Sequence, residues 1–174
     1  MRALFAGPVL RLVSVGLVVL ALQRTLAADH PIANVRVQIV LALVAGAGAG
    51  AGAERGAFAG FVLGLMYDLG VGSPLGLTAL CYGVAGLVAG YAISITPDPQ
   101  WWLAMIFAAL GAAIGEASIP VVRLLTGEAG WVDSRMIPPV VAAALATAIL
   151  SPLFVPLGRW CAGAKRKKWK AMIE

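Results

Sequence analysis

The chain has 174 residues, of which 61% are hydrophobic and only 12% are charged, and its mean hydropathy is +0.93. Because soluble domains carry about 25% charged residues, this composition excludes an ordinary water-soluble globular domain. The net charge is +5, and five of the thirteen Lys and Arg residues fall in one short run near the C-terminus. These properties predict an all-α integral membrane protein with a single domain.

Hydrophobic segments predict about six transmembrane helices, since a helix that crosses a bilayer needs about 20 mainly apolar residues. In chain order the segments are 9–27, 35–53, 56–69, 75–95, 101–125 and 137–157. The first reads better as a retained helix than as a cleaved signal, because further hydrophobic segments follow it. Only Glu54 and Arg55 separate the second from the third. A five-span alternative, with these two segments as one broken or re-entrant pair, therefore stays open.

The distribution of basic residues predicts the orientation. With six spans both termini lie on one side, which then carries nine Lys and Arg residues against four on the other. The nine are Arg2, Arg11, Arg55, Arg159 and five residues of the tail; the four are Arg24, Arg36, Arg123 and Arg135. Because cytoplasmic loops are enriched in Lys and Arg, both termini are expected in the cytoplasm.

The basic tail, residues 165–174, follows a transmembrane domain that covers residues 1–164. Its positive charges are Lys165, Arg166, Lys167, Lys168 and Lys170. The run directly follows a hydrophobic segment, and no folded basic domain accompanies it. We therefore interpret it as an anchor to anionic lipid headgroups and expect no nucleic-acid partner.

Glycines recur at four-residue spacing in three of the segments. Gly56, Gly60 and Gly64 share one helix face, and the pairs Gly86/Gly90 and Gly111/Gly115 repeat the spacing. Small residues at this spacing let helix backbones approach closely within a bilayer. Residues 46–52 alternate Gly and Ala, so this low-propensity stretch needs close neighbours or is locally pliable.

Three charged groups in or beside these segments are candidates for function, because charge at membrane depth is costly. Asp68 ends the third segment, and it is either an acid at headgroup level or part of a site. Glu116 and Arg123 lie seven residues apart on one face of the fifth, with Pro120 between them. A structural pairing inside the bundle is the favoured interpretation of Glu116; a ligand or proton site and a partner contact stay open.

Signatures of catalysis and of metal binding are weak. The single histidine, His30, precedes a proline, and no nucleophile, base and orienting group can be assembled around it. The two cysteines, Cys81 and Cys161, have neither disulfide-framework nor metal-ligand spacing. We therefore expect no enzyme, no cofactor and no metal.

One stretch resembles a known family. Residues 56–69 read GAFAGFVLGLMYDL and residues 72–80 read GSPLGLTAL, which is similar to the core motif of the MreD family of bacterial rod shape-determining membrane proteins. The matching positions are Gly56, Gly60, Phe61, Gly64, Asp68, Pro74, Leu75 and Gly76, with Gly83, Gly86, Gly90 and Tyr91 fitting the helix that follows. The chain departs from the family at Ala33-Asn34, where a Pro-Asp pair is usual.

The resemblance implies a compact six-helix bundle similar to the substrate-binding subunits of vitamin transporters of the energy-coupling-factor type. It also implies a non-catalytic scaffold of the cell-wall elongation machinery in the bacterial cytoplasmic membrane. Its expected partners are MreC and, through MreC, the RodA glycosyltransferase, a class B penicillin-binding transpeptidase and MreB. The alternative function is a vitamin-type small-molecule binding subunit of a transporter.

Overall fold

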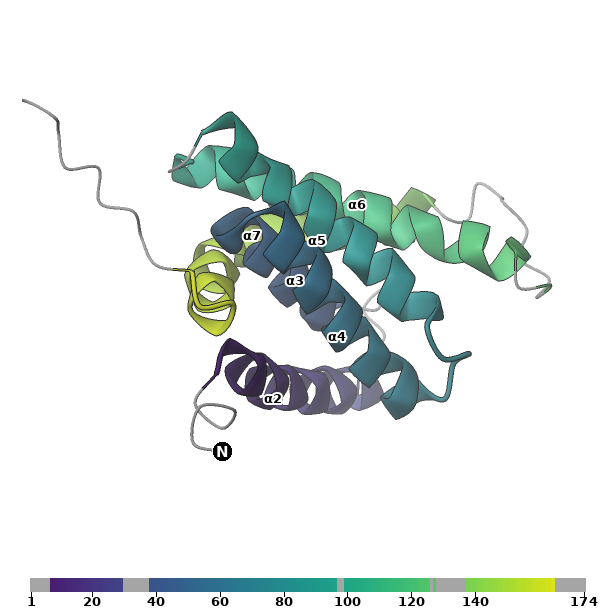
Figure 1. The fold of residues 1–174 in the computed structure, drawn as a ribbon. Helices are drawn as coiled ribbons and strands as arrows, with labels where there is room; N and C mark the ends of the chain where they lie inside the picture. Colours follow the sequence, from purple (N-terminus) through teal and green to yellow (C-terminus); the bar gives the residue numbers. More distant parts are fainter. Residues whose placement is uncertain (1–6, 30–37, 97–98, 126, 128–136, 165–174) are drawn as a thin grey trace, which may run out of the picture.

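The computed structural model describes residues 7–29, 38–96, 99–125, 127 and 137–164. Within these ranges the chain is all helical and has no strand, and its six helices form one bundle (Figure 1). The helices are α2 (Pro8–Asp29), α3 (Ile39–Ala51), α4 (Ala53–Val71), α5 (Leu77–Ile95), α6 (Trp101–Leu125) and α7 (Ile137–Cys161). The all-α prediction is confirmed.

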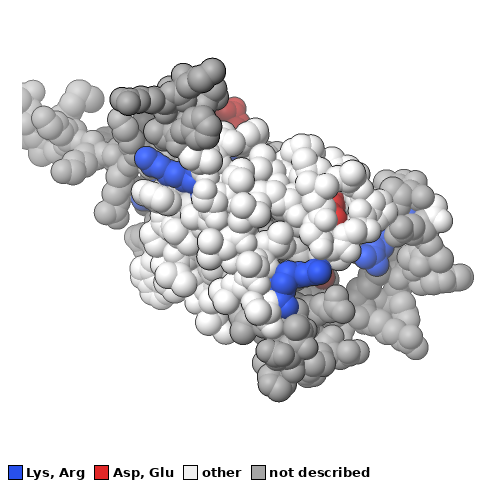
Figure 2. All heavy atoms as spheres, turned by 90° about the horizontal axis from the view of Figure 1, so that it is seen from below, with Lys and Arg blue, Asp and Glu red and all other residues white. Residues whose placement is uncertain are grey.

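Four helices, α2, α5, α6 and α7, are long and apolar enough to cross a membrane. The face shown in Figure 2 agrees with a lipid environment, since most of its described part is uncharged and only a few Lys, Arg, Asp and Glu side chains interrupt it. The 13 residues of α3 extend about 20 Å at 1.5 Å per residue, which is shorter than the roughly 30 Å hydrocarbon core of a bilayer. The 19-residue α4 carries Glu54, Arg55 and Asp68 and is not one of the four. The chain is thus a helical membrane protein.

The short helix α3 forms the centre of the bundle. Every residue from Ile39 to Gly50 is buried, and α4, α5, α6 and α7 all pack extensively on it. The alternating glycines allow four helices to pack around α3, because a helix face without side chains lets neighbouring backbones approach closely. A Cβ added to Gly46 would lie 2.5 Å from the carbonyl oxygen of Phe154, and one on Gly50 would lie 2.6 Å from that of Val155. The Gly-Ala stretch is therefore held by close neighbours.

The chain reverses between α3 and α4 at a single residue, Gly52, whose φ of +99° is readily adopted only by glycine. The Gly52 N–H donates to the Gly48 carbonyl, and the Gly56 N–H donates to the Gly52 carbonyl, both at 2.8 Å. The expectation that Glu54 and Arg55 separate the two segments is wrong, because both residues lie in the first turn of α4. Polarity alone does not end a helix; the backbone conformation at Gly52 does.

Three helix backbones meet next to this reversal. A Cβ on Gly48 of α3 or on Gly56 of α4 would overlap the carbonyl oxygen of Gly86 in α5. Gly48 and Gly56 each lie four residues from Gly52, so the hairpin brings them together against the same point of α5. Close approach of this kind increases van der Waals contact between the helices. Such contact is important in a bilayer, because the hydrophobic effect does not drive helices together in lipid.

Successive helices run in opposite directions, so the bundle has two ends. Pro8, at the start of α2, lies beside Cys161, at the end of α7, and Gly90 of α5 packs against Ala53 of α4. We call this the Gly52 end and the opposite one the Asp68 end. Exposed aromatic side chains gather at the Gly52 end: Tyr91, Trp101, Trp102 and Trp160. Tyr and Trp are enriched where a membrane meets water, and the Gly52 end has the exposed aromatic residues typical of such an interface.

Candidate functional site

Asp68 lies at the end of α4 with 1% of its surface exposed, and its carboxylate organises the turn into α5. The Ser73 hydroxyl donates to it at 2.7 Å and the Gly76 N–H at 2.9 Å. The N–H groups of Thr78 and Ala79 donate to it at 3.2 and 3.3 Å. The first N–H groups of a helix have no partner inside that helix, and a negative charge there is favourable. Asp68 thus caps α5 from the preceding helix.

The turn that Asp68 holds exposes two residues of the motif. Gly76 has a φ of +98°, which directs its N–H toward Asp68 at no steric cost. Pro74 and Leu75 stand outside, and Leu75 is 68% exposed. The turn is therefore rigid at its base, while its tip carries an apolar side chain that contacts no core.

The glycine face of α4 packs on α5. A Cβ on Gly60 would overlap the backbone carbonyl of Tyr82, and one on Gly64 would lie 2.5 Å from the Cα of Ala79. With Gly56 against Gly86, these contacts form the most extensive helix pair of the bundle. Phe61 projects outward instead and is 45% exposed. The glycines thus serve packing within the chain, whereas Phe61 leaves part of its ring at the surface.

A second polar group lies at the Asp68 end and joins three segments. The Tyr82 hydroxyl of α5 donates to the Gln38 side-chain oxygen at 2.9 Å, and the Gln38 amide donates to Glu116 of α6 at 2.6 Å. Arg123 attracts the Glu116 carboxylate electrostatically. Glu116 thus has the expected opposite charge near it, and Gln38 donates a hydrogen bond to it. The sequence interpretation missed Gln38, which stands only one residue before a buried apolar helix.

Both ends of the buried helix α3 receive side-chain caps from other helices. The Val40 N–H donates to the side-chain oxygen of Gln23 in α2 at 2.9 Å. The Arg159 Nε of α7 donates to the carbonyl oxygen of Gly50 at 2.9 Å. Because buried peptide groups without partners are costly, these contacts let a short helix stay in the middle of the bundle. Gln23 is buried, with 6% of its surface exposed, and this contact gives it a structural role between α2 and α3.

The remaining candidates carry no assembled chemistry in the described part of the chain. Cys81 and Cys161 are buried, free thiols, and no three His, Cys, Asp or Glu side chains of the described residues gather as a metal site. His30 and the basic residues Lys165, Arg166, Lys167 and Lys168 lie outside the described ranges. The polar groups that the structure does bring together hold helix ends and turns in place.

The chain was compared with protein families, curated proteins and solved structures. No family model, curated protein or solved structure matches it.

Proposed function

We propose that this protein is a non-catalytic membrane scaffold of the MreD type, which supports cell shape by binding MreC. The observation that carries the proposal is the α4–α5 hairpin. Five positions of the motif have a geometric part in it: Gly56, Gly60 and Gly64 at the helix contact, Asp68 as the cap, and Gly76 at the turn. These residues fix the shape of the hairpin, so we interpret the motif as the support of a binding surface and not as a reactive group.

The partner surface consists of the motif residues that internal packing leaves unused. Phe61 on α4 and Leu75 at the tip of the turn are both exposed, and the hairpin beneath them is held by Asp68 and the glycine contacts. Preorganised apolar anchors of this kind carry much of the energy of protein interfaces. MreC contacts these residues, and RodA, the transpeptidase and MreB associate through MreC.

The proposal includes six membrane crossings with both termini in the bacterial cytoplasm. It is supported by the alternating helix directions, which give the described chain both its ends on one side of the bundle. Arg11, Arg55 and Arg159 belong to that Gly52 end, and the basic tail follows from it. A cytoplasmic Gly52 end satisfies the positive-inside rule. The proposal also includes a helix arrangement similar to that of the vitamin-binding subunits of transporters, with a scaffolding function instead of transport.

The test is affinity purification of the tagged full-length chain from membranes that also contain MreC. The wild-type protein should recover MreC, and Phe61→Ala and Leu75→Ala should recover less than half as much. Ile149→Ala on α7 is the matched control, because Ile149 is an aliphatic residue outside the motif that is 76% exposed, against 68% for Leu75, and it should recover the wild-type amount. A clean preparation that lacks MreC and retains a vitamin-like molecule would overturn the scaffold in favour of the transporter subunit.

A further inference from the structure

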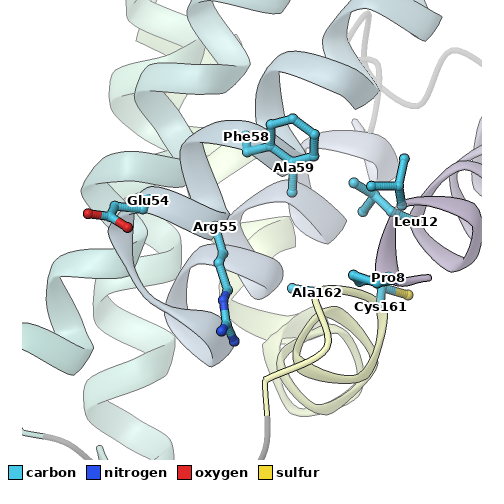
Figure 3. A pocket seen from close by; sticks show the side chains of 9 residues that line it. Pro8, Leu12, Glu54, Arg55, Phe58, Ala59, Cys161 and Ala162 are labelled. Carbon is cyan, nitrogen blue, oxygen red and sulfur yellow. The ribbon is translucent and has the colours of Figure 1, made fainter. Parts of the chain in front are cut away.

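A partly open cavity of about 230 Å³ lies at the Gly52 end, between the beginning of α2, the beginning of α4 and the end of α7. Its wall is apolar and comes from Pro8, Val9, Leu12, Phe58, Ala59 and Cys161 (Figure 3). The helix α2 packs less extensively on its neighbours than the other helices do, and this leaves the space open. A partly open cavity with an apolar wall suits a hydrocarbon chain.

The volume of the cavity limits which molecules can bind in it. A ten-residue helix, about 15 Å long and 10 Å across, fills on the order of 1,000 Å³, which is several times the 230 Å³ available. A partner helix therefore does not fit. Part of a single unbranched hydrocarbon chain fits this volume, and it would enter between α2 and α4 and contact Leu12 and Phe58.

Two side chains of opposite charge, Glu54 and Arg55, line the mouth of the cavity. Arg55 stands at the rim in Figure 3, whereas the Glu54 side chain points away from the other lining residues. Two further arginines belong to the same end. Arg11 lies with its guanidinium 5.0 Å from the centre of the Trp160 ring, and Arg159 donates to Gly50. The exposed tryptophans place this end at headgroup level, which is where lipid phosphates lie.

We propose that this cavity is a binding site for an anionic phospholipid, with an acyl chain inside it and the phosphate at Arg55. A guanidinium pairs well with a phosphate because it offers several N–H donors in a planar fork. A net negative headgroup such as phosphatidylglycerol is preferred, because the positive choline group of phosphatidylcholine would be repelled by the neighbouring arginines. The bound lipid fills the space beside α2 and fastens that helix to α4 and α7. This site is independent of the proposed scaffold function.

The experiment is native mass spectrometry of the full-length protein in detergent, with phosphatidylglycerol or phosphatidylcholine added at equal concentration. The wild type should retain phosphatidylglycerol preferentially. Arg55→Gln should lower that preference about fivefold, since one basic residue near an anionic lipid surface contributes about 1 kcal/mol. Val9→Trp should reduce retention of both lipids, because the larger side chain occupies the cavity from an exposed position.

Matched controls are available on α2 itself. Val18 is 68% exposed and lies outside the cavity, whereas Val9, which lines it, is 48% exposed, so Val18→Trp should retain both lipids like the wild type. Arg24→Gln removes an exposed arginine at the other end of α2 and should keep the lipid preference. Thermal unfolding verifies that each variant is folded. If Val9→Trp does not fold, Arg55→Gln still tests the site, because Arg55 is exposed and its replacement does not disturb the core. Equal retention of the two lipids by the wild type, or unchanged preference in Arg55→Gln, would overturn the site.

Discussion

Replacing Asp68 by alanine removes the acceptor of four hydrogen bonds at the α4–α5 turn. The bonds from the Thr78 and Ala79 N–H groups are buried, and each buried donor left without an acceptor costs about 1–3 kcal/mol. The Ser73 hydroxyl and the Gly76 N–H are only partly buried, so water can replace the carboxylate there. Removal of a buried charge also recovers its desolvation cost, and we expect a net loss of stability of about 2–3 kcal/mol.

The assay is unfolding of the purified protein in mixed micelles with increasing SDS, followed by tryptophan fluorescence. Asp68→Asn keeps one acceptor oxygen and should lose about half as much stability, about 1–1.5 kcal/mol. Glu54→Gln changes an exposed carboxyl group in the same helix, and it should stay within about 0.5 kcal/mol of the wild type. If Asp68→Ala unfolds at the same SDS fraction as Glu54→Gln, the capping argument is refuted.

The other predictions use the same unfolding assay. Gly60→Ala places a Cβ against the α5 backbone and should lose about 1–3 kcal/mol; wild-type stability would refute close packing there. Gly83→Ala should instead gain about 0.5–1 kcal/mol from helix propensity, because the nearest atom to its Cβ lies 3.6 Å away; a loss would contradict this. Gln38→Leu leaves the Tyr82 hydroxyl and the Glu116 carboxylate without their bonds to Gln38 and should cost about 2–4 kcal/mol. An unchanged midpoint would show that the network does not stabilise the bundle.

Several helix boundaries were predicted from the sequence because the signals that set them are local. Residues 101–125 were predicted as one helix, and α6 spans Trp101–Leu125; residues 75–95 were predicted, and α5 spans Leu77–Ile95. Prolines on one side and a glycine turn on the other bound these elements, and both act through the dihedral angles of their own residues. The break between α3 and α4 was misplaced, because several glycines in the run could adopt a positive φ and only the packed bundle selects Gly52.

The candidate site was predicted as a set of residues but not as a set of contacts. Asp68 was identified as a charge at the end of a segment, yet its partners lie five to eleven residues later and face it only because the turn folds back. Glu116 was expected to pair within the bundle, with Arg123 the nearest opposite charge in sequence. Gln38, which donates a hydrogen bond to it, is 78 residues away. Contacts of this kind depend on which helices become neighbours.

The sequence by itself determined that this protein is helical and belongs in a membrane, because hydrophobicity and chain-breaking residues act locally and add up along the chain. It also identified Asp68 and the glycine spacing on which the proposed function rests. Only the tertiary structure decided that α3 is the buried centre, that Gly48, Gly56 and Gly86 meet at one point, and that an apolar cavity lies beside Arg55. Those features follow from helix packing. Packing brings together surfaces of segments that are far apart in the sequence, so no single stretch of residues predicts it.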